Sequence, residues 1–250
     1  MQTITSSKNP KVLAWRSLKE KKGRDSLDSF LVEGSRMVCE AFSSAFSVQA
    51  VLLREGENPP CDFPSSVPVY VLSSHVFQSV CDTKSPQGIA AVLSRRILPL
   101  SGSRFLALDG IQDPGNMGTM IRTADAAGFD GLILSADCTD IFSPKVLRAT
   151  MGSIFRMSFS LVRDLPAELR DLRNKGFSIL SSQLDGEPFY ERKDVASSFV
   201  LIIGNEGNGI SDPVKAEATH RLLLPMRGGA ESLNAAVAAG IMMYDLMKNA

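Results

Sequence analysis

From residue 105 onward, short apolar segments alternate with stretches of helical periodicity, and this alternation constrains the fold more than any other feature. The expected strands are residues 105–109, 131–135, 157–162, 177–182, 199–204 and 221–226. The expected helices lie near residues 116–127, 144–154, 166–175, 212–218 and 232–248. Short apolar strands that alternate with helices are typical of a parallel sheet covered on both faces. The sequence therefore predicts an α/β fold for this part of the chain.

The first hundred residues carry a smaller α/β pattern. We expect an amphipathic helix over residues 8–22, a helix over residues 35–44 and a short helix after Ser73. The expected strands are residues 30–34, 49–53, 69–72 and 88–94. Residues 95–104 contain proline, glycine and two serines, which is typical of a linker. We therefore expect two domains, residues 1–98 and residues 99–250.

Bulk properties exclude several classes of protein. The chain has 250 residues, 44% of them hydrophobic, which is enough for one large core or two smaller ones. No apolar run reaches the ~18 residues of a membrane-spanning helix. The first residues lack the apolar segment of a secretory signal. We expect a cytoplasmic protein with no membrane partner.

Cysteines and histidines are too few and too scattered to indicate a metal centre. The four cysteines, Cys39, Cys61, Cys81 and Cys138, form no C-x-x-C pair, so neither a zinc site nor a redox motif is indicated. We interpret them as buried thiols. The histidines are two, His75 and His220. We expect no metal cofactor.

Positive charge is concentrated at the N-terminus of a chain whose net charge is zero. Residues 1–24 contain one acidic residue, Glu20, and seven basic residues: Lys8, Lys11, Arg16, Lys19, Lys21, Lys22 and Arg24. Such a patch suits the phosphate backbone of a nucleic acid. A solvated helix face explains it equally well.

Three loops follow expected strands, where open α/β sheets bind ligands. In the first, residues 109–129, a Gly/Pro turn leads into a helix that we expect to be capped by Asn116 and to end at Gly128. Arg122 lies two turns into that helix, beside Thr119, on its polar face. A capped helix with a surface arginine is the alternative interpretation.

The second loop, in residues 201–211, has three glycines in the pattern G-x-x-G-x-G around Glu206. Glycines allow close backbone approach or a positive φ angle, and an ordinary tight turn does not need three of them. The pattern is neither G-x-G-x-x-G nor a P-loop, so a nucleotide-dependent enzyme of another α/β class is not supported.

The third loop, in residues 222–247, leads into a helix that we expect Ser232 to cap, with Asn234 at its start. The helix is rich in alanine, glycine and methionine on more than one face, which indicates burial all round. Either an internal core helix or a dimer interface accounts for this composition.

Together these loops carry a resemblance to a known family. The sequences N-x-G-x-x-x-R-T-A (116–124), GNEGNGIS (204–211) and LPM-x-G-x-x-x-SLN-x-x-V-A (224–238) resemble the three motifs of the SpoU/TrmH family of RNA 2′-O-ribose methyltransferases, in the family's order. Residues 6–34 and SPQGIAAV (85–92) resemble the L30e-like RNA-binding domain of many members. The third motif reads S-L-N-A-A where many members have S-L-N-V-S, which weakens an assignment of substrate by resemblance.

The resemblance implies a fold and an activity. It implies an α/β knot (SPOUT) methyltransferase domain, with a trefoil knot in the chain, preceded by a small α/β L30e-like domain. It implies S-adenosylmethionine as cofactor, ribosomal RNA as the favoured substrate with transfer RNA as an alternative, and a homodimer joined through the C-terminal domain. The basic residues of the N-terminal segment would contact the RNA.

The resemblance also assigns residues to the site. The cofactor-binding residues it implies are Ser182, Gln183, Gly204, Asn205, Gly209, Leu224, Met226 and Leu233. The catalytic residues it implies are Arg122, Asn116, Glu206, Ser232 and Asn234. Because a guanidinium group is protonated at neutral pH, two roles stay open for Arg122: a general base, or an electrostatic anchor for phosphate and developing alkoxide.

Two rival functions share this scaffold. One is a catalytically silent RNA-binding or ribosome-assembly factor. The other is a base methyltransferase. Binding of S-adenosylmethionine tests the first alternative, and the chemistry of the methylated product tests the second.

Overall fold

The structure of the chain is a computed structural model that describes residues 2–248. The chain divides into two compact units. Unit 1 comprises the described residues up to Arg96 together with Asp140–Arg156. Unit 2 comprises Ile97–Thr139 and the described residues from Met157 onward. Within the described residues, no helix is long and apolar enough to cross a bilayer.

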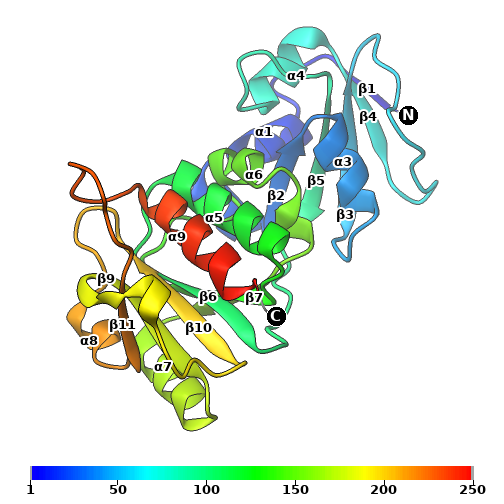
Figure 1. Cartoon of the computed structure of the whole chain (residues 1–250). Helices are drawn as coiled ribbons and strands as arrows, with labels where there is room; N and C mark the ends of the chain where they lie inside the picture. Colours follow the sequence, from blue (N-terminus) through cyan, green and yellow to red (C-terminus); the bar gives the residue numbers. More distant parts are fainter. Residues whose placement is uncertain (1, 249–250) are drawn as a thin grey trace. The chain divides into compact units, whose positions relative to one another are not determined.

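Unit 1 is built on a mixed five-stranded sheet with the order β1-β4-β3-β5-β2 (Figure 1). The strands are β1 (Gln2–Ile4), β2 (Ser29–Glu33), β3 (Val48–Arg54), β4 (Val69–Leu72) and β5 (Ile89–Ser94). β1, β4 and β3 pair in parallel, whereas β5 pairs antiparallel with β3 and β2. β2 to β5 match the predicted strands to within one or two residues, and β1 was not predicted.

Helices cover both faces of this sheet. α1 (Pro10–Ser17) and α4 (Ser74–Val80) share one core with the sheet, in which the rings of Trp15 and Tyr70 lie 5.1 Å apart. On the opposite face, α3 (Ser35–Phe42) is joined by α6 (Pro144–Thr150) and the short helix η1 (Ser153–Phe155).

The segment 140–156 belongs to the core of unit 1, although it lies between strands of unit 2 in sequence. The ring of Phe142 packs 4.8 Å from that of Phe30, and the ring of Phe155 packs 5.4 Å from that of Phe46, centroid to centroid. α6 thus packs in unit 1 and is not part of unit 2, whose segments precede and follow it in sequence.

A buried ion pair fixes the start of that segment. Arg24, which is 3% exposed, donates from Nε to Asp140 Oδ2 at 2.8 Å and from Nη1 to the carbonyl oxygens of Leu18 and Lys19 at 2.8 Å each. Those carbonyls lie just beyond α1, where helices leave acceptors unpaired. The guanidinium group of Arg24 therefore caps the C-terminal end of α1 and also binds the segment 140–156.

Two sequence predictions about unit 1 are wrong. The single helix expected over residues 8–22 is two helices, α1 and α2 (Lys21–Leu27), because the chain turns where Arg24 binds the end of α1. The cysteines are not all thiols either. Cys39 and Cys61 form a disulfide with Cα atoms 6.2 Å apart, whereas Cys81 and Cys138 are free.

Unit 2 is a three-layer α/β sandwich around an all-parallel six-stranded sheet with the order β11-β9-β10-β6-β7-β8. The strands are β6 (Arg104–Asp109), β7 (Gly131–Ser135), β8 (Ser158–Val162), β9 (Ser178–Pro188), β10 (Phe199–Gly204) and β11 (His220–Leu223). α5 (Pro114–Ala127) and α9 (Ala235–Leu246) cover one face; α7 (Leu165–Asn174) and α8 (Asp212–Lys215) cover the other (Figure 1). A short helix, η2 (Phe189–Glu191), follows β9. The predicted α/β fold class is confirmed.

Removal of the buried guanidinium group in Arg24→Ala leaves the Asp140 carboxylate and two carbonyls without their donor. Breaking one side of a buried pair costs about 3–5 kcal/mol, so we expect the free energy of unfolding to fall by about that amount in urea denaturation. The control is Arg54→Ala, because Arg54 pairs with Glu57 at the surface, where such pairs contribute ~1 kcal/mol or less. Equal losses in the two variants would contradict the bridging role of Arg24.

Candidate active site

The carboxyl ends of the central strands of unit 2 carry the residues singled out in the sequence. Gly204 at the end of β10 pairs in register with Asp109 at the end of β6. The loop after β6 leads into α5, and the loop after β11 leads into α9. α5 and α9 begin close together, because Asn234 Nδ2 donates to Asn116 Oδ1 at 2.9 Å. The three motifs therefore meet at one edge of the sheet.

The glycine-rich loop after β10 folds back on itself. Asn205 and Gly209 exchange backbone hydrogen bonds of 3.0 and 2.9 Å. Gly209 has φ +69°, and a Cβ on Gly204 would come within 2.2 Å of the Gly209 carbonyl carbon and the Ile210 nitrogen. Glycine is thus required at both positions, and the loop presents Glu206 at its tip.

The Glu206 carboxylate joins the three motifs. It accepts hydrogen bonds from the backbone N–H groups of Gln112 at 3.3 Å and Asp113 at 3.2 Å, and from Asn116 Nδ2 at 3.0 Å. Asn116 in turn accepts from Asn234, whose Oδ1 caps α9 at the Ala236 N–H. One carboxylate and two amides therefore link β10, α5 and α9.

Two predicted helix caps are displaced. The cap of α5 is Asp113, which accepts from the Asn116 N–H at 2.7 Å, and the cap of α9 is Asn234 rather than Ser232. Pro114 at the first helical position starts α5 earlier than expected, because proline suits that position. The shift leaves the side chains of Asn116 and Ser232 free for other contacts.

A pocket of about 270 Å³ lies beside this network. All eight residues predicted to bind the cofactor line it, as do the predicted catalytic residues Glu206 and Ser232. Asn116 and Asn234 do not line it; they hold Glu206 and the start of α9. The roles of these residues in binding and catalysis stay predictions, but the structure brings ten of them together on one pocket.

One wall of the pocket comes from an excursion of β9. β11 pairs with β9 at Ser181 and resumes only at Glu187, so the residues between them bulge out of the sheet. The bulge brings Ser182, Gln183 and Leu184 to the pocket. Leu184 was missed in the sequence because its position depends on the register of the partner strand.

Arg122 lies away from this pocket. It is an exposed residue of α5 and is not among the pocket-lining residues. It follows Asn116 by six residues, which is about 9 Å along the helix axis and about 240° around it. In this structure, the predicted catalytic arginine therefore does not line the cavity that the motifs form.

Comparisons with known proteins agree with this geometry. Residues 103–244 match the model of the SpoU rRNA methylase family, and residues 9–91 match the MRM3-like substrate binding domain. The chain belongs to the SpoU rRNA methylase family. This membership confirms the family and the enzyme class predicted from the three motifs.

Individual relatives of this SpoU protein match over nearly their whole length. It is 39% identical to the 23S rRNA (guanosine(2553)-2′-O)-methyltransferase RlmP of Bacillus subtilis over 98% of this chain and 99% of that protein. It superimposes on a putative RNA methyltransferase of the TrmH family from Porphyromonas gingivalis with a TM-score of 0.88, at 31% identity over 97% of this chain and 98% of that one. For an AdoMet-bound rRNA methyltransferase from Sinorhizobium meliloti, the TM-score is 0.87 at 29% identity, over 99% and 97%.

The basic residues predicted to contact RNA are not equivalent in the structure. Lys8, Arg16, Lys21 and Lys22 are exposed. Lys11 bonds the Tyr70 hydroxyl, and Lys19 bonds the Ser79 carbonyl. Arg24 is buried against Asp140, so in this conformation its guanidinium group is not available to a phosphate.

The network at Glu206 shifts the titration of that carboxylate. Burial raises its pKa, but the hydrogen bonds from Asn116 and from backbone N–H groups outweigh burial and hold the pKa below its ordinary value. Glu206 is therefore ionised at neutral pH and acts as an acceptor for all its donors.

Replacement of this carboxylate in Glu206→Gln gives a pH-dependent loss of stability. Because the folded pKa is lowered, the unfolded chain binds a proton first as the pH falls. The stabilisation from Glu206 is thus complete above the ordinary carboxyl pKa of ~4.3 and is lost as the pH falls through the lowered folded value. We expect the difference in Tm between wild type and Glu206→Gln to shrink between pH 6 and pH 3.

The control for this titration is Glu231→Gln, which removes one exposed carboxylate from the same unit. A Tm difference for Glu206→Gln that stays constant from pH 6 to pH 3 would contradict the hydrogen-bonded, ionised carboxylate.

Proposed function

We propose that this chain transfers a methyl group from S-adenosylmethionine to a ribose 2′-hydroxyl of ribosomal RNA. The observation that supports the proposal is the convergence of three motif loops on one pocket, tied by the hydrogen bonds from Asn116 to Glu206 and from Asn234 to Asn116. The 39% identity to a 23S rRNA ribose methyltransferase over nearly the whole chain favours 23S rRNA over transfer RNA.

The pocket fits S-adenosylmethionine chemically. Much of its lining is backbone and aliphatic side chain, and Gly204 cannot carry a side chain because a Cβ would meet the opposite strand of the loop. Apart from Glu206 the lining residues are uncharged, and walls of this kind suit an adenine ring. Glu206 supplies one carboxylate on the lining, which complements a positively charged group of the cofactor.

Within this site, each polar residue has a distinct task. When bound, the cofactor supplies an electrophilic methyl group. Ser232 lines the pocket and positions ribose or cofactor, while Asn116 and Asn234 keep Glu206 and the two helix starts in place. Holding the hydroxyl oxygen in line with the methyl carbon accounts for much of the rate, because orientation lowers the barrier of such displacements.

Arg122 completes the site from a second copy of the chain. It is exposed and does not line the pocket of its own chain, which favours a site in which a partner protomer brings its Arg122 to the substrate. There a guanidinium group binds the target phosphate and stabilises the developing alkoxide.

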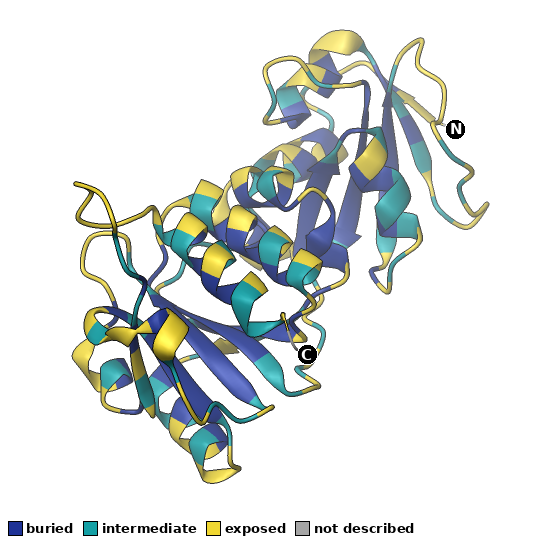
Figure 2. Cartoon of the chain, in the orientation of Figure 1, coloured by how far each residue is buried: buried dark blue, intermediate teal, exposed yellow. Residues whose placement is uncertain are grey.

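An apolar stripe on α9 supports the homodimer. Val237, Ile241 and Tyr244 are 50%, 37% and 57% exposed. Their spacing of four and three residues places them on one face of the helix, which Figure 2 shows as exposed positions along α9. A large apolar face left open to water is typical of a subunit contact.

Unit 1 would recognise the RNA. Its match to a substrate binding domain and the exposed Lys8, Arg16, Lys21 and Lys22 support this role. By sequence we assign the RNA-binding domain to residues 1–98 and the methyltransferase domain, with the family's knot, to residues 99–250, with the segment 140–156 of the latter packed into unit 1. Since ribosomal RNA is the substrate, the protein acts in the cytoplasm.

A direct test uses unmodified 23S rRNA transcribed in vitro and labelled S-adenosylmethionine. Wild type transfers label to one nucleotide, and the modified linkage resists alkaline hydrolysis because the 2′-hydroxyl is blocked. We expect Arg122→Ala to lower transfer by at least about 100-fold, in the range found when a charge-stabilising donor is lost, while calorimetry shows unchanged cofactor binding.

The matched control is Arg163→Ala, which removes an exposed arginine elsewhere in unit 2. Retained turnover in Arg122→Ala would remove this residue from the mechanism. A wild-type chain that binds no S-adenosylmethionine would instead be a silent RNA-binding factor, and a product labile to alkali would indicate a base methyltransferase.

Charge placed on the apolar stripe tests the dimer. We expect Val237→Glu to give monomers in analytical ultracentrifugation and to lose methyl transfer, since the carboxylate is desolvated at the contact. Leu161→Glu is the matched control, because Leu161 is 53% exposed on the edge strand β8. A wild-type monomer with full activity would overturn both the dimer and the trans role of Arg122.

A further inference from the structure

Unit 1 contains a second pocket, of about 290 Å³, at the carboxyl end of β2. It is bounded by the start of α3, by the loop between α4 and β5, and by the end of α6. Every lining residue belongs to unit 1, so this pocket is separate from the cavity of the motif loops. Its size is near the lower end of the range for small-molecule sites.

The wall from α6 is held in an unusual conformation. Met151 ends that helix with φ +51°, a left-handed conformation that bulky side chains rarely adopt, yet its apolar side chain is 39% exposed. The next residue, Gly152, has φ +97°, and a Cβ there would lie 1.7 Å from Glu40 Oε2. The backbone at Met151 is therefore strained, and the turn at Gly152 packs closely against Glu40 of α3. Backbone strain of this kind is concentrated at functional sites.

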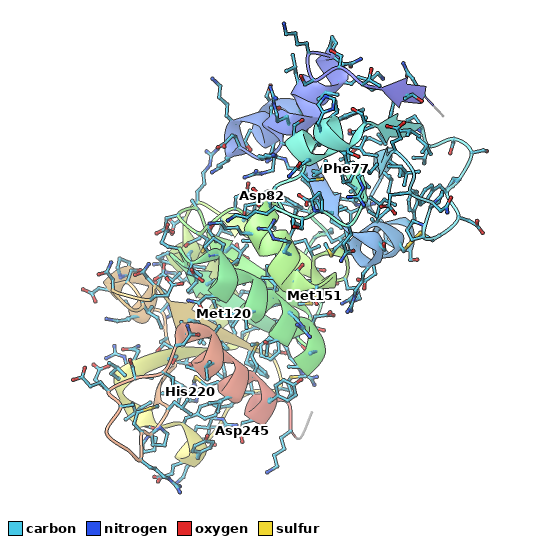
Figure 3. The ribbon with its side chains drawn as sticks, turned by 90° about the horizontal axis from the view of Figure 1, so that it is seen from above. Phe77, Asp82, Met120, Met151, His220 and Asp245 are labelled. Atoms are coloured by element: carbon cyan, nitrogen blue, oxygen red, sulfur yellow. A yellow bond between two sulfur atoms is a disulfide. The ribbon has the colours of Figure 1, made fainter. Side chains whose placement is uncertain are left out.

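Apolar and cationic groups face the pocket together. Met37, Pro86 and Met151 provide apolar walls, and Arg36 and Arg148 provide guanidinium groups that are 62% and 41% exposed. Figure 3 marks Met151 and also Asp82, the ion-pair partner of Arg148.

Arg36 and Arg148 each use only part of their N–H donors. Among the described residues, Arg36 uses only Nε, toward Glu40, and Arg148 uses only Nη1, toward Asp82. A guanidinium group has five N–H donors in a planar fork. Within residues 2–248 the remaining donors of both arginines make no hydrogen bond to a protein acceptor, which leaves them available to a phosphate or a base.

Glu33, the acidic residue of the pocket, already accepts hydrogen bonds from the protein backbone. Glu33 accepts the N–H groups of Asp82 at 2.6 Å and Thr83 at 3.3 Å. Its carboxylate therefore shapes the loop between α4 and β5, and its charge is partly neutralised by these donors.

We infer that this pocket binds one unpaired nucleotide of the RNA substrate, with the base against Met151 and Pro86 and the phosphate at Arg36 and Arg148. Sequence-specific RNA recognition uses splayed-out bases that stack on aromatic side chains or arginine planes, and flipped bases also pack between apolar side chains. The inference rests on the proposed function only for the identity of the RNA. It assigns recognition to a site apart from the basic N-terminal segment and from the methyl-transfer pocket.

The test measures binding of unmodified 23S rRNA in the presence of excess transfer RNA as competitor. We expect Met151→Ala to raise the Kd and the KM for RNA about tenfold, because the exposed Met151 side chain becomes buried against the bound base and this contact is lost, with kcat and cofactor binding unchanged. Leu27→Ala is the matched control, because Leu27 is a 43% exposed apolar residue of unit 1 outside the pocket. Met151→Gly serves as a second variant, since glycine adopts a positive φ freely and the fold is therefore retained.

Salt dependence tests the cationic side. We expect Arg36→Gln to reduce the slope of log Kd against log salt by about one, the value of one phosphate contact. Arg54→Gln is the control, because Arg54 also pairs with a nearby carboxylate but does not line the pocket.

The outcomes separate this inference from the proposed function. If the Met151 and Arg36 variants bind RNA like their controls, the nucleotide pocket is overturned even when the wild type methylates rRNA. If those variants bind more weakly while the wild type transfers no methyl group, the pocket stands and the proposed function fails. If the wild type does not bind the RNA, the pocket is overturned.

Discussion

The arrangement of the candidate active site depends on one carboxylate, that of Glu206. It is presented by a loop rich in glycine, and such loops lose much conformational entropy on folding. Hydrogen bonds from the Gln112 and Asp113 N–H groups and from Asn116 Nδ2 hold it, and Asn234 extends the chain of contacts to α9. Parallel pairing of β10 with β6 brings these loops to one edge of the sheet, and this network links all three of them, in addition to hydrogen bonds from Asn205 Nδ2 to the Gly110 carbonyl and from the Ser211 N–H to Asp109. Because these hydrogen bonds hold Glu206, the glycine-rich loop that forms one wall of the pocket stays ordered although it places few side chains in the pocket.

The sequence predicted the sheet of unit 2 well because its strands are short, apolar and bounded by turn residues. β7 and β10 have the expected limits, and all eight residues assigned to the cofactor by resemblance line the pocket. The excursion of β9 that carries Leu184 could not be predicted, since it arises from pairing with β11, which lies more than thirty residues later. Side-chain periodicity within a strand contains no information on the register of its partner.

Other differences have the same physical origin. Residues 8–22 have one amphipathic pattern, yet the chain turns after α1 because Arg24 binds the Leu18 and Lys19 carbonyls that follow this helix and Asp140, 116 residues away. Likewise, α6 has the pattern of an ordinary surface helix, and nothing local shows that Phe142 packs on Phe30 of another sheet. Helix patterns specify that one face is buried, but the sheet that buries it is selected by complementary shape at long range.

This long-range packing has a functional consequence. The segment 140–156 leaves unit 2, contributes Arg148 and Met151 to the pocket of unit 1, and returns to unit 2 at Met157. A pocket built partly from the sequence of the methyltransferase domain cannot be formed by residues 1–98 alone. The proposed RNA pocket therefore depends on a segment that lies between strands of unit 2 in sequence, and we expect a sequence change that displaces α6 to alter substrate recognition.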